Sequence, residues 1–211
     1  MTIQLDCYYS LSSPWAYFAG PQLQDVVRRH KVKLVFKPYD FQEVVVKTGG
    51  VPIRTRPEPR RVYHDEELAR WSRYLGMPIN VQPRHYPRYT VADRNWNKYA
   101  GWMVIAAQQQ GLDVQPLSHA LLRALWAEER DTSLPEVRIA IADENGYDGA
   151  ALHALEQAPA TLEQFRAFSE EAERLGVFGA PTYIIHGQTE RFWGQDRLFF
   201  VDRALAQLRT P

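Results

Sequence analysis

Residues 8–17, which read YYSLSSPWAY, decide the fold. They overlap a short apolar run at residues 2–9 that predicts a strand, and they lead into residues 14–30, where apolar side chains recur at helical spacing. Ser13 therefore falls at the N-cap of the predicted helix, and Pro14 takes the first helical position, where its missing N–H costs nothing. A side chain at this place lies beside free backbone N–H groups and the positive end of the helix dipole, which favours an anion or a thiolate.

Composition limits the classes of partner. The 211 residues carry 25 lysines and arginines against 25 aspartates and glutamates, and this neutral balance argues against nucleic acid as the main partner. The length predicts one domain with room for a large insertion. The chain starts directly with strand-like sequence, and no apolar run approaches the ~18 residues of a membrane span. We therefore expect a cytoplasmic protein without a membrane partner.

The cysteine and histidine pattern excludes two kinds of centre. Cys7 is the single cysteine, so neither an intrachain disulfide nor a Cys-x-x-Cys redox centre can form. Its place in the first strand predicts a small buried apolar residue. The six histidines show no metal-ligand spacing with one another, so we expect no metal site.

The order of the remaining elements predicts the fold class. A second strand at residues 33–39 completes a right-handed βαβ unit with parallel strands. A run of helices follows, expected at residues 62–75, 98–110, 117–129, 135–145, 148–156 and 161–175. Two strands, at residues 182–186 and 189–193, then flank Gly187-Gln188, a two-residue hairpin turn, and residues 197–208 form a last helix.

This order, βαβ, helical block, ββα, predicts an α/β fold of the thioredoxin-like type with a large all-helical insertion. Residues 1–50 and 176–211 would form a discontinuous thioredoxin-like domain. Residues 51–175 would form the helical insertion with its connecting loops.

An arginine-rich segment lies between the two parts. Residues 49–61 contain three prolines and two glycines, which predict a loop rather than a long helix. The loop carries Arg54, Arg56, Arg60 and Arg61. These side chains form either a solvated basic loop or a set of guanidinium groups for an anionic substrate.

Two further segments meet Ser13 if the fold is right. In thioredoxin-like folds the proline before the third strand, here Pro181, is cis, and the preceding residue, Ala180, offers its backbone N–H and C=O to an extended peptide. The second segment is Gly194-Gln195-Asp196-Arg197, which opens the last helix. Asp196 there is either a helix cap or a counter-ion for a ligand ammonium.

Together these groups suit a ligand with an extended backbone, a thiol, an ammonium and carboxylates, and glutathione has all four. Arg60 or its neighbours would meet a carboxylate, and Asp196 would meet the γ-glutamyl ammonium. Ala180 would meet the cysteinyl backbone and Ser13 the sulfur.

The motifs match one known family in order and along nearly the whole chain. They are residues 8–17, Arg60-x-x-Tyr63 with Glu67 and Arg70-Trp71, Trp126 with Arg130-Asp131, residues 176–182, and residues 192–197. The chain resembles the DsbA-like family that contains 2-hydroxychromene-2-carboxylate isomerases and kappa-class glutathione transferases.

The resemblance implies a glutathione-dependent enzyme and a homodimer. Where disulfide oxidoreductases of this fold have Cys-x-x-Cys, this chain has Ser13-Pro14-Trp15-Ala16, so dithiol exchange is excluded. The resemblance implies that Ser13 is catalytic and stabilises the thiolate of bound glutathione. The implied glutathione-binding residues are Arg60, Ala180, Pro181, Gln195, Asp196 and Arg197.

The implied reaction converts 2-hydroxychromene-2-carboxylate to trans-o-hydroxybenzylidenepyruvate, a small aromatic carboxylate. The thiolate adds to the conjugated double bond, the resulting single bond rotates, and elimination returns the thiol. Candidates for an aromatic wall, each of which has simple core packing as its alternative, are Trp15, Tyr17, Tyr86, Tyr89 and Trp193. Candidates for the substrate carboxylate are Arg54, Arg56, Arg84 and Arg88.

Two other functions stay open. One is a kappa-like glutathione transferase or peroxidase, which needs the same Ser13 and the same glutathione site. The other is a non-catalytic, DsbA-like peptide-binding module, which would tolerate Ser13→Ala.

Overall fold

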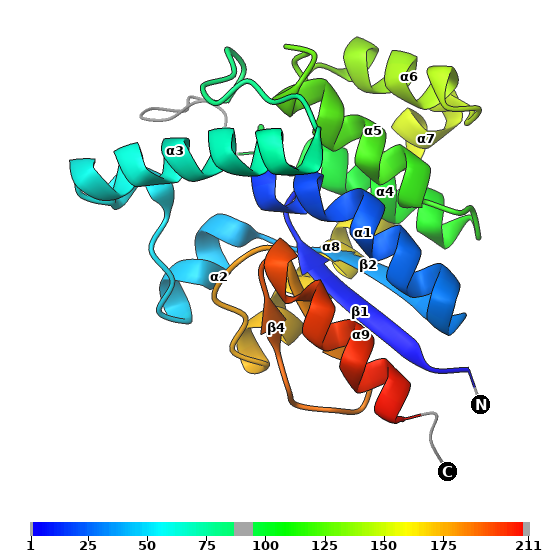
Figure 1. Cartoon of the computed structure of the whole chain (residues 1–211). Coiled ribbons are helices and arrows are strands. Elements are labelled where there is room, and N and C mark those ends of the chain that lie inside the picture. Colours follow the sequence, from blue (N-terminus) through cyan, green and yellow to red (C-terminus); the bar gives the residue numbers. More distant parts are fainter. Residues whose placement is uncertain (1, 87–94, 209–211) are drawn as a thin grey trace.

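A mixed sheet with helices on both faces forms the centre of the molecule (Figure 1). The computed structural model describes residues 2–86 and 95–208. Two strands come from the first forty residues and two from the last thirty, so the sheet joins both ends of the chain, with the helical run between them. The predicted α/β thioredoxin-like fold with a helical insertion is confirmed.

The strand order is β2-β1-β3-β4. β1 (Gln4–Tyr9) pairs in parallel with β2 (Lys33–Pro38), as the βαβ prediction requires, and antiparallel with β3 (Thr182–Ile185). β4 (Phe192–Trp193) is a short edge strand. Its pairing of Thr182 with Trp193 is the register that a turn at Gly187-Gln188 would give.

The predicted two-residue hairpin is nevertheless wrong in extent. Only two residues of β4 pair with β3, and residues 186–191 are not part of a strand. The turn hydrogen bond runs from the Gln188 N–H to the Ile185 carbonyl, and the Arg191 guanidinium donates to the Leu175 carbonyl at 2.6 Å. This side-chain bond ties the second arm of the hairpin to the helical run instead of to β3.

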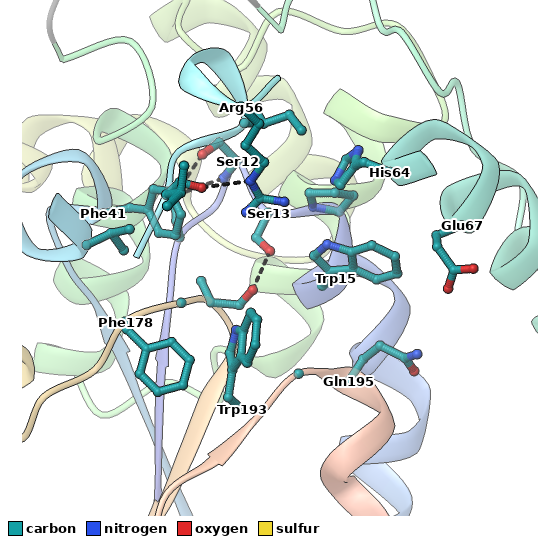
Figure 2. A pocket seen from close by; sticks show the side chains of 18 of the residues that line it. Ser12, Ser13, Trp15, Phe41, Arg56, His64, Glu67, Phe178, Trp193 and Gln195 are labelled. Carbon is teal, nitrogen blue, oxygen red and sulfur yellow. Dashed lines mark hydrogen bonds between the residues drawn. The ribbon is translucent and has the colours of Figure 1, made fainter. Parts of the chain in front are cut away.

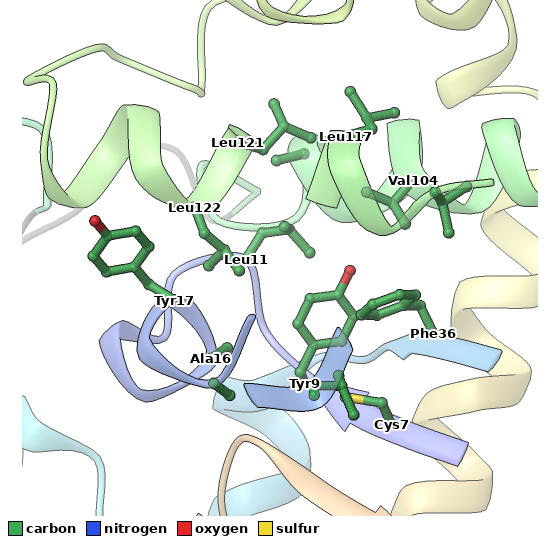
Figure 3. Packing of buried hydrophobic residues seen from close by; sticks show 14 of the residues in the cluster. Cys7, Tyr9, Leu11, Ala16, Tyr17, Phe36, Val104, Leu117, Leu121 and Leu122 are labelled. Carbon is green, nitrogen blue, oxygen red and sulfur yellow. The ribbon is translucent and has the colours of Figure 1, made fainter. Parts of the chain in front are cut away.

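The side chains of β1 alternate between the two faces of the sheet, and each face packs against its own part of the core. Leu5, Cys7 and Tyr9 face the larger cluster, which α1 (Pro14–His30) shares with helices of the insertion (Figure 3). Tyr8 faces the opposite side of the sheet, within a smaller cluster. Cys7 is 2% exposed, as predicted, and burial raises the pKa of its thiol.

The helices of the insertion and of the C-terminal end follow the predicted order with small shifts at their ends. Their bounds are α3 (Glu58–Leu75), α4 (Tyr99–Gln109), α5 (Gln115–Trp126), α6 (Pro135–Glu144), α7 (Gly149–Glu156), α8 (Pro159–Arg174), η2 (Gln195–Arg197) and α9 (Leu198–Gln207). Of the helices in the described ranges, none combines the length and the apolar character that crossing a membrane requires.

The predicted loop at residues 49–61 is wrong in part. α3 begins at Glu58, because Pro57 stands at its N-cap and Pro59 in its first turn, where the missing N–H groups have no helical partner to lose. Arg60 and Arg61 therefore lie on the first turn of a helix. A short turn, η1 (Ile53–Thr55), precedes it.

One helix was not predicted. α2 (Phe41–Lys47) follows β2 directly, and its N-cap Asp40 accepts a hydrogen bond from the Glu43 N–H at 3.2 Å. Val44 and Val45 are its buried residues, and they pack into the smaller cluster beneath the sheet. Phe41 and Val45 of α2 line the same cavity as Ser13, the N-cap of α1.

Candidate functional site

A cavity of about 350 Å³ lies at the N-terminus of α1 (Figure 2). This volume is in the range of small-molecule sites in proteins. The start of α1, η1 and α3, the loop before β3 and the turn after β4 form its walls. Of the predicted site residues, the cavity brings together Ser13, Arg60, Ala180, Gln195, Asp196 and Arg197. Pro181 lies behind this wall, against a separate interior void of about 20 Å³.

Ser13 caps α1 as predicted. Its Oγ accepts a hydrogen bond from the Ala16 N–H at 3.2 Å and donates one to the Ala180 carbonyl at 3.0 Å. The residue is 8% exposed, and its backbone is extended, with φ −88° and ψ 118°. The hydroxyl therefore connects the start of α1 to the loop before β3, and its single proton is held by Ala180.

The loop before β3 has the backbone form that the fold predicts. The Ala180–Pro181 peptide bond is cis. Within residues 2–86 and 95–208, no group accepts a hydrogen bond from the Ala180 N–H. A Cβ at Gly179 would overlap the Trp193 indole nitrogen, so only glycine lets this ring approach the loop so closely. The loop thus presents one free backbone donor between Ser13 and Trp193.

The turn after β4 contributes polar groups of different kinds. Gln195 is buried, and its Oε1 accepts a long hydrogen bond, 3.4 Å, from Gln22 on α1. The Asp196 carboxylate contacts the neighbouring Arg197 guanidinium, and both side chains are exposed. Asp196 caps no helix, because the residue before η2 is Gly194 and no side chain caps that end. The predicted role of Asp196 as a helix cap is therefore wrong, and its role as a counter-ion for a ligand stays a prediction.

Only some of the predicted arginines reach the cavity. Arg56 and Arg60 line it, whereas Arg54 donates to Gln42 at 2.8 Å and lies outside, as does Arg84. Arg56 is half-buried, and its Nε donates to the Val51 carbonyl at 2.8 Å. Burial and the charge of Arg60 lower the pKa of the Arg56 guanidinium. Arg88 falls outside the described residues.

The aromatic wall is smaller than predicted. Trp15, Tyr86 and Trp193 line the cavity, but Tyr17 does not. Tyr17 lies two positions beyond Trp15, which puts it on the other side of α1. Its hydroxyl donates to the Pro78 carbonyl at 2.9 Å, and its ring stacks on His119. The prediction for Tyr17 is therefore wrong, and Tyr89 falls outside the described residues.

Several cavity residues were not assigned a role from the sequence. On α3, His64, Glu67 and Trp71 follow the predicted Arg60 at intervals of four, three and four residues and share the face that lines the cavity. This spacing was a readable signal, although α3 was expected to start later. Phe41, Val45 and Phe178 come from segments with no such pattern. Ser10 and Ser12 were read as part of the motif without a role of their own.

The cavity has two chemically different sides around Ser13. Figure 2 shows His64, Glu67 and Gln195 on one side and Phe41 and Phe178 on the other. The polar side also carries the Asp196–Arg197 pair. This arrangement can hold a charged, peptide-like group on one side and an apolar body on the other, with the Ser13 hydroxyl between them.

The described residues include no group of three or more His, Cys, Asp or Glu side chains that could hold a metal ion. The polar groups that line the site include hydroxyls, backbone groups, guanidinium groups, carboxylates and the His64 imidazole. The N-terminus of α1 adds its dipole, which stabilises negative charge next to Ser13.

The chain is similar to known proteins over nearly its whole length. The chain is 28% identical to a 2-hydroxychromene-2-carboxylate isomerase of Sphingobium xenophagum, over 97% of this chain and 99% of the relative. It is 24% identical to the isomerase of that name in Pseudomonas putida, over 97% and 95%, and 20% identical to human glutathione S-transferase kappa 1, over 96% and 91%.

Solved structures show the same fold. A structure of 2-hydroxychromene-2-carboxylate isomerase matches 97% of this chain and 95% of its own, with a TM-score of 0.76 and 24% identity. Cytosolic disulfide reductase DsbM from Pseudomonas aeruginosa, solved with GSH, matches 98% and 100%, with a TM-score of 0.64 and 20% identity. The family model of the DSBA-like thioredoxin domain matches residues 4–206. The chain therefore belongs to the family of DSBA-like thioredoxin domains.

Proposed function

We propose that the protein is a glutathione-dependent isomerase of the 2-hydroxychromene-2-carboxylate isomerase type, acting on an intermediate of aromatic degradation. The observation that carries the proposal is the Ser13 hydroxyl at the start of α1, inside a cavity and without a cysteine nearby except the buried Cys7. Relatives named as isomerases of this type match nearly the whole length of the chain, which supports the reaction class.

The polar side of the cavity fits glutathione. The Ala180 N–H is an unused backbone donor next to the cis peptide bond, suited to the cysteinyl residue of an extended peptide. Asp196 is the acidic group for the γ-glutamyl ammonium, and the exposed guanidinium groups of Arg60 and Arg197 suit its carboxylates. Gln195 and Pro181 support this wall from inside the protein.

Bound glutathione supplies a thiol whose ionised form adds reversibly to a conjugated double bond. The chain's own task is to keep that sulfur ionised and to orient the second substrate. Ser13 donates a hydrogen bond to the sulfur, and the N-terminus of α1 lowers the energy of the negative charge. The apolar side of the cavity holds the aromatic ring away from water.

A kappa-like glutathione transferase is the alternative, and the human kappa relative supports it. It would use the same Ser13 and the same glutathione site. The two activities differ in the second substrate, so a binding experiment with glutathione tests both and an activity assay separates them.

The test is calorimetric titration of the protein with glutathione. We expect saturable heat with the wild type and a strong loss of affinity in Asp196→Ala. Asp25→Ala is the matched control, because Asp25 is also an exposed carboxylate paired with a nearby arginine, Arg28, but lies outside the cavity. No binding by the wild type would overturn both glutathione-dependent functions.

If glutathione binds, absorbance at the chromene band follows ring opening of 2-hydroxychromene-2-carboxylate. Glutathione-dependent turnover supports the isomerase. Binding without turnover, together with conjugation of an electrophilic aromatic halide, would favour the transferase instead. Glutathione binding without activity in either assay, unchanged in Ser13→Ala, would favour the peptide-binding module.

A further inference from the structure

The hydroxyls of Ser10 and Ser12, close to Ser13 in the sequence, have one proton that forms no hydrogen bond within the described part of the protein. Ser10 and Ser12 are buried and line the cavity, and their Oγ atoms lie 2.8 Å apart. Ser10 Oγ also accepts a hydrogen bond from the Ser12 N–H at 3.3 Å. The bond between the two oxygens consumes one of their two hydroxyl protons. No other group in the described part of the chain accepts the second proton, so the pair offers one donor to whatever fills the cavity.

Arg56 also lines the cavity with hydrogen-bond donors that have no acceptor within the described part of the protein. Its guanidinium is half-buried, and only its Nε has a protein acceptor, the Val51 carbonyl. No carboxylate among the described residues forms an ion pair with it, although the neighbouring Arg60 adds positive charge. A partly desolvated guanidinium without a counter-ion favours the binding of an anion, and its two terminal nitrogens suit a carboxylate.

These donors lie beside Ser13, between the polar and the apolar side of the cavity. In Figure 2, Arg56 and Ser12 are next to Ser13, with Phe41 on the side away from Glu67 and Gln195. Phe178 packs edge-on against the Trp193 ring at 4.9 Å between centroids and continues the apolar wall. A ligand held here would have its anionic group at Arg56 and its apolar body between these rings.

We propose that Arg56 and the Ser10–Ser12 hydroxyl pair form a carboxylate-binding subsite that orients the second substrate, an aromatic carboxylate, next to Ser13. The reaction that this subsite serves rests on the proposed function, whereas the subsite itself can be measured without glutathione. The subsite would recognise a carboxylate group, and both the second substrate and glutathione carry one. The observations favour the second substrate, because the cavity that Arg56 lines also has an apolar surface at Phe41 and Phe178, whereas glutathione is polar along its length.

The test compares two ligands of nearly equal shape, trans-cinnamate and its neutral amide, trans-cinnamamide, by calorimetric titration without glutathione. We expect the wild type to bind cinnamate at least about tenfold more tightly than the amide, since a charge-assisted, two-pronged hydrogen bond is lost with the carboxylate. Arg56→Gln should abolish that preference. Arg56→Lys, which keeps the charge without the fork, should reduce it, and Ser12→Ala should weaken cinnamate binding by roughly threefold to tenfold.

Arg54→Gln is the matched control, because it removes the same charge from the same segment but from a side chain that bonds Gln42 outside the cavity. It should bind cinnamate as the wild type does. Equal affinity of the wild type for cinnamate and cinnamamide would overturn the proposal. Equal loss of cinnamate binding in Arg54→Gln and Arg56→Gln would also overturn it, because the effect would then be one of overall charge.

Titration of the Arg56 and Ser12 variants with glutathione distinguishes the two sources of the carboxylate. Unchanged glutathione affinity together with lost cinnamate preference supports the subsite for the second substrate. Loss of glutathione affinity with unchanged cinnamate binding would assign Arg56 to glutathione and refute the inference. If the wild type binds cinnamate selectively but no glutathione, the proposed function fails and the subsite remains.

Discussion

Replacement of Ser13 by alanine should separate the structural role of this hydroxyl from its chemical role. The change removes the cap of α1, which typically contributes about 1 kcal/mol. It also leaves the buried Ala180 carbonyl without its donor, at a further cost of about 1–2 kcal/mol. We expect the free energy of unfolding to fall by about 2–3 kcal/mol in urea denaturation, which corresponds to a Tm lower by roughly 4–12 °C for a chain of this size.

The same variant should lose far more activity than its stability explains. A hydrogen bond to a charged sulfur contributes about 1.5–3 kcal/mol, so kcat/KM for glutathione-dependent ring opening should fall roughly 10- to 150-fold at a temperature well below Tm. Ser13→Gly should restore most of the cap energy, because glycine is a good N-cap residue, without restoring activity.

Asp148→Ala is the matched control for the loss of a cap. Asp148 caps α7 by accepting a hydrogen bond from the Ala151 N–H at 2.9 Å, and it does not line the cavity. It should cost about 1 kcal/mol of stability and leave ring opening unchanged. Activity of Ser13→Ala within twofold of the wild type would refute the assignment of Ser13 to the chemistry. It would leave Ser13 as a cap alone.

Three further changes test the structure elsewhere. Glu156→Gln should lower the free energy of unfolding by about 3–5 kcal/mol in urea denaturation, because it leaves the buried Arg138 guanidinium without its carboxylate. Burial lowers the pKa of His119, so the unfolded chain takes up a proton before the folded chain does, and the wild type loses stability as the pH falls. His119→Asn should therefore reduce the loss of unfolding free energy between about pH 7.5 and pH 5. Gly179→Ala should weaken glutathione binding by roughly tenfold in calorimetry, since the added Cβ displaces the Trp193 indole from the loop.

Each of these expectations has an outcome that contradicts it. For the ion pair, the double variant Arg138→Met/Glu156→Leu should recover much of the lost stability, and a double variant as unstable as the single one would point to packing instead. For His119, equal pH dependence of the wild type and the variant would show that its proton uptake is not linked to unfolding. For Gly179, unchanged affinity would mean that the indole moves without consequence for the site.

The elements with a local cause could be predicted from the sequence. Ser13-Pro14 sets the start of α1 through capping and proline geometry, which depend on neighbouring residues only. Gly76, with φ +65°, ends α3 for an equally local reason. The start of α3 was missed because Pro57 and Pro59 were read as helix breakers, although proline is accepted in a first turn.

The candidate site was predictable only where backbone position decides it. Ser13 and Ala180 follow from the fold, because a helix start and the loop before a strand occupy fixed places in it. Arg56 and Tyr17 were both candidates from the sequence, but tertiary packing decides between them. The position of η1 brings Arg56 into the cavity, whereas the orientation of α1 turns Tyr17 away from it. Phe41 could not have been identified, because the helix that carries it was itself not predicted.

The single proton of Ser13 sets a condition on any thiolate chemistry at this site. In the absence of a ligand the proton is donated to the Ala180 carbonyl at 3.0 Å. A thiolate bound beside Ser13 competes with that carbonyl, and it wins because hydrogen bonds to ionised acceptors are about twice as strong as those between neutral groups. In the proposed glutathione complex, the Ala180 carbonyl loses this donor while its free N–H gains an acceptor on the ligand. Ligand binding thus exchanges one hydrogen bond of the loop for another, and the cap from the Ala16 N–H, which uses a lone pair of Ser13 rather than its proton, is preserved throughout.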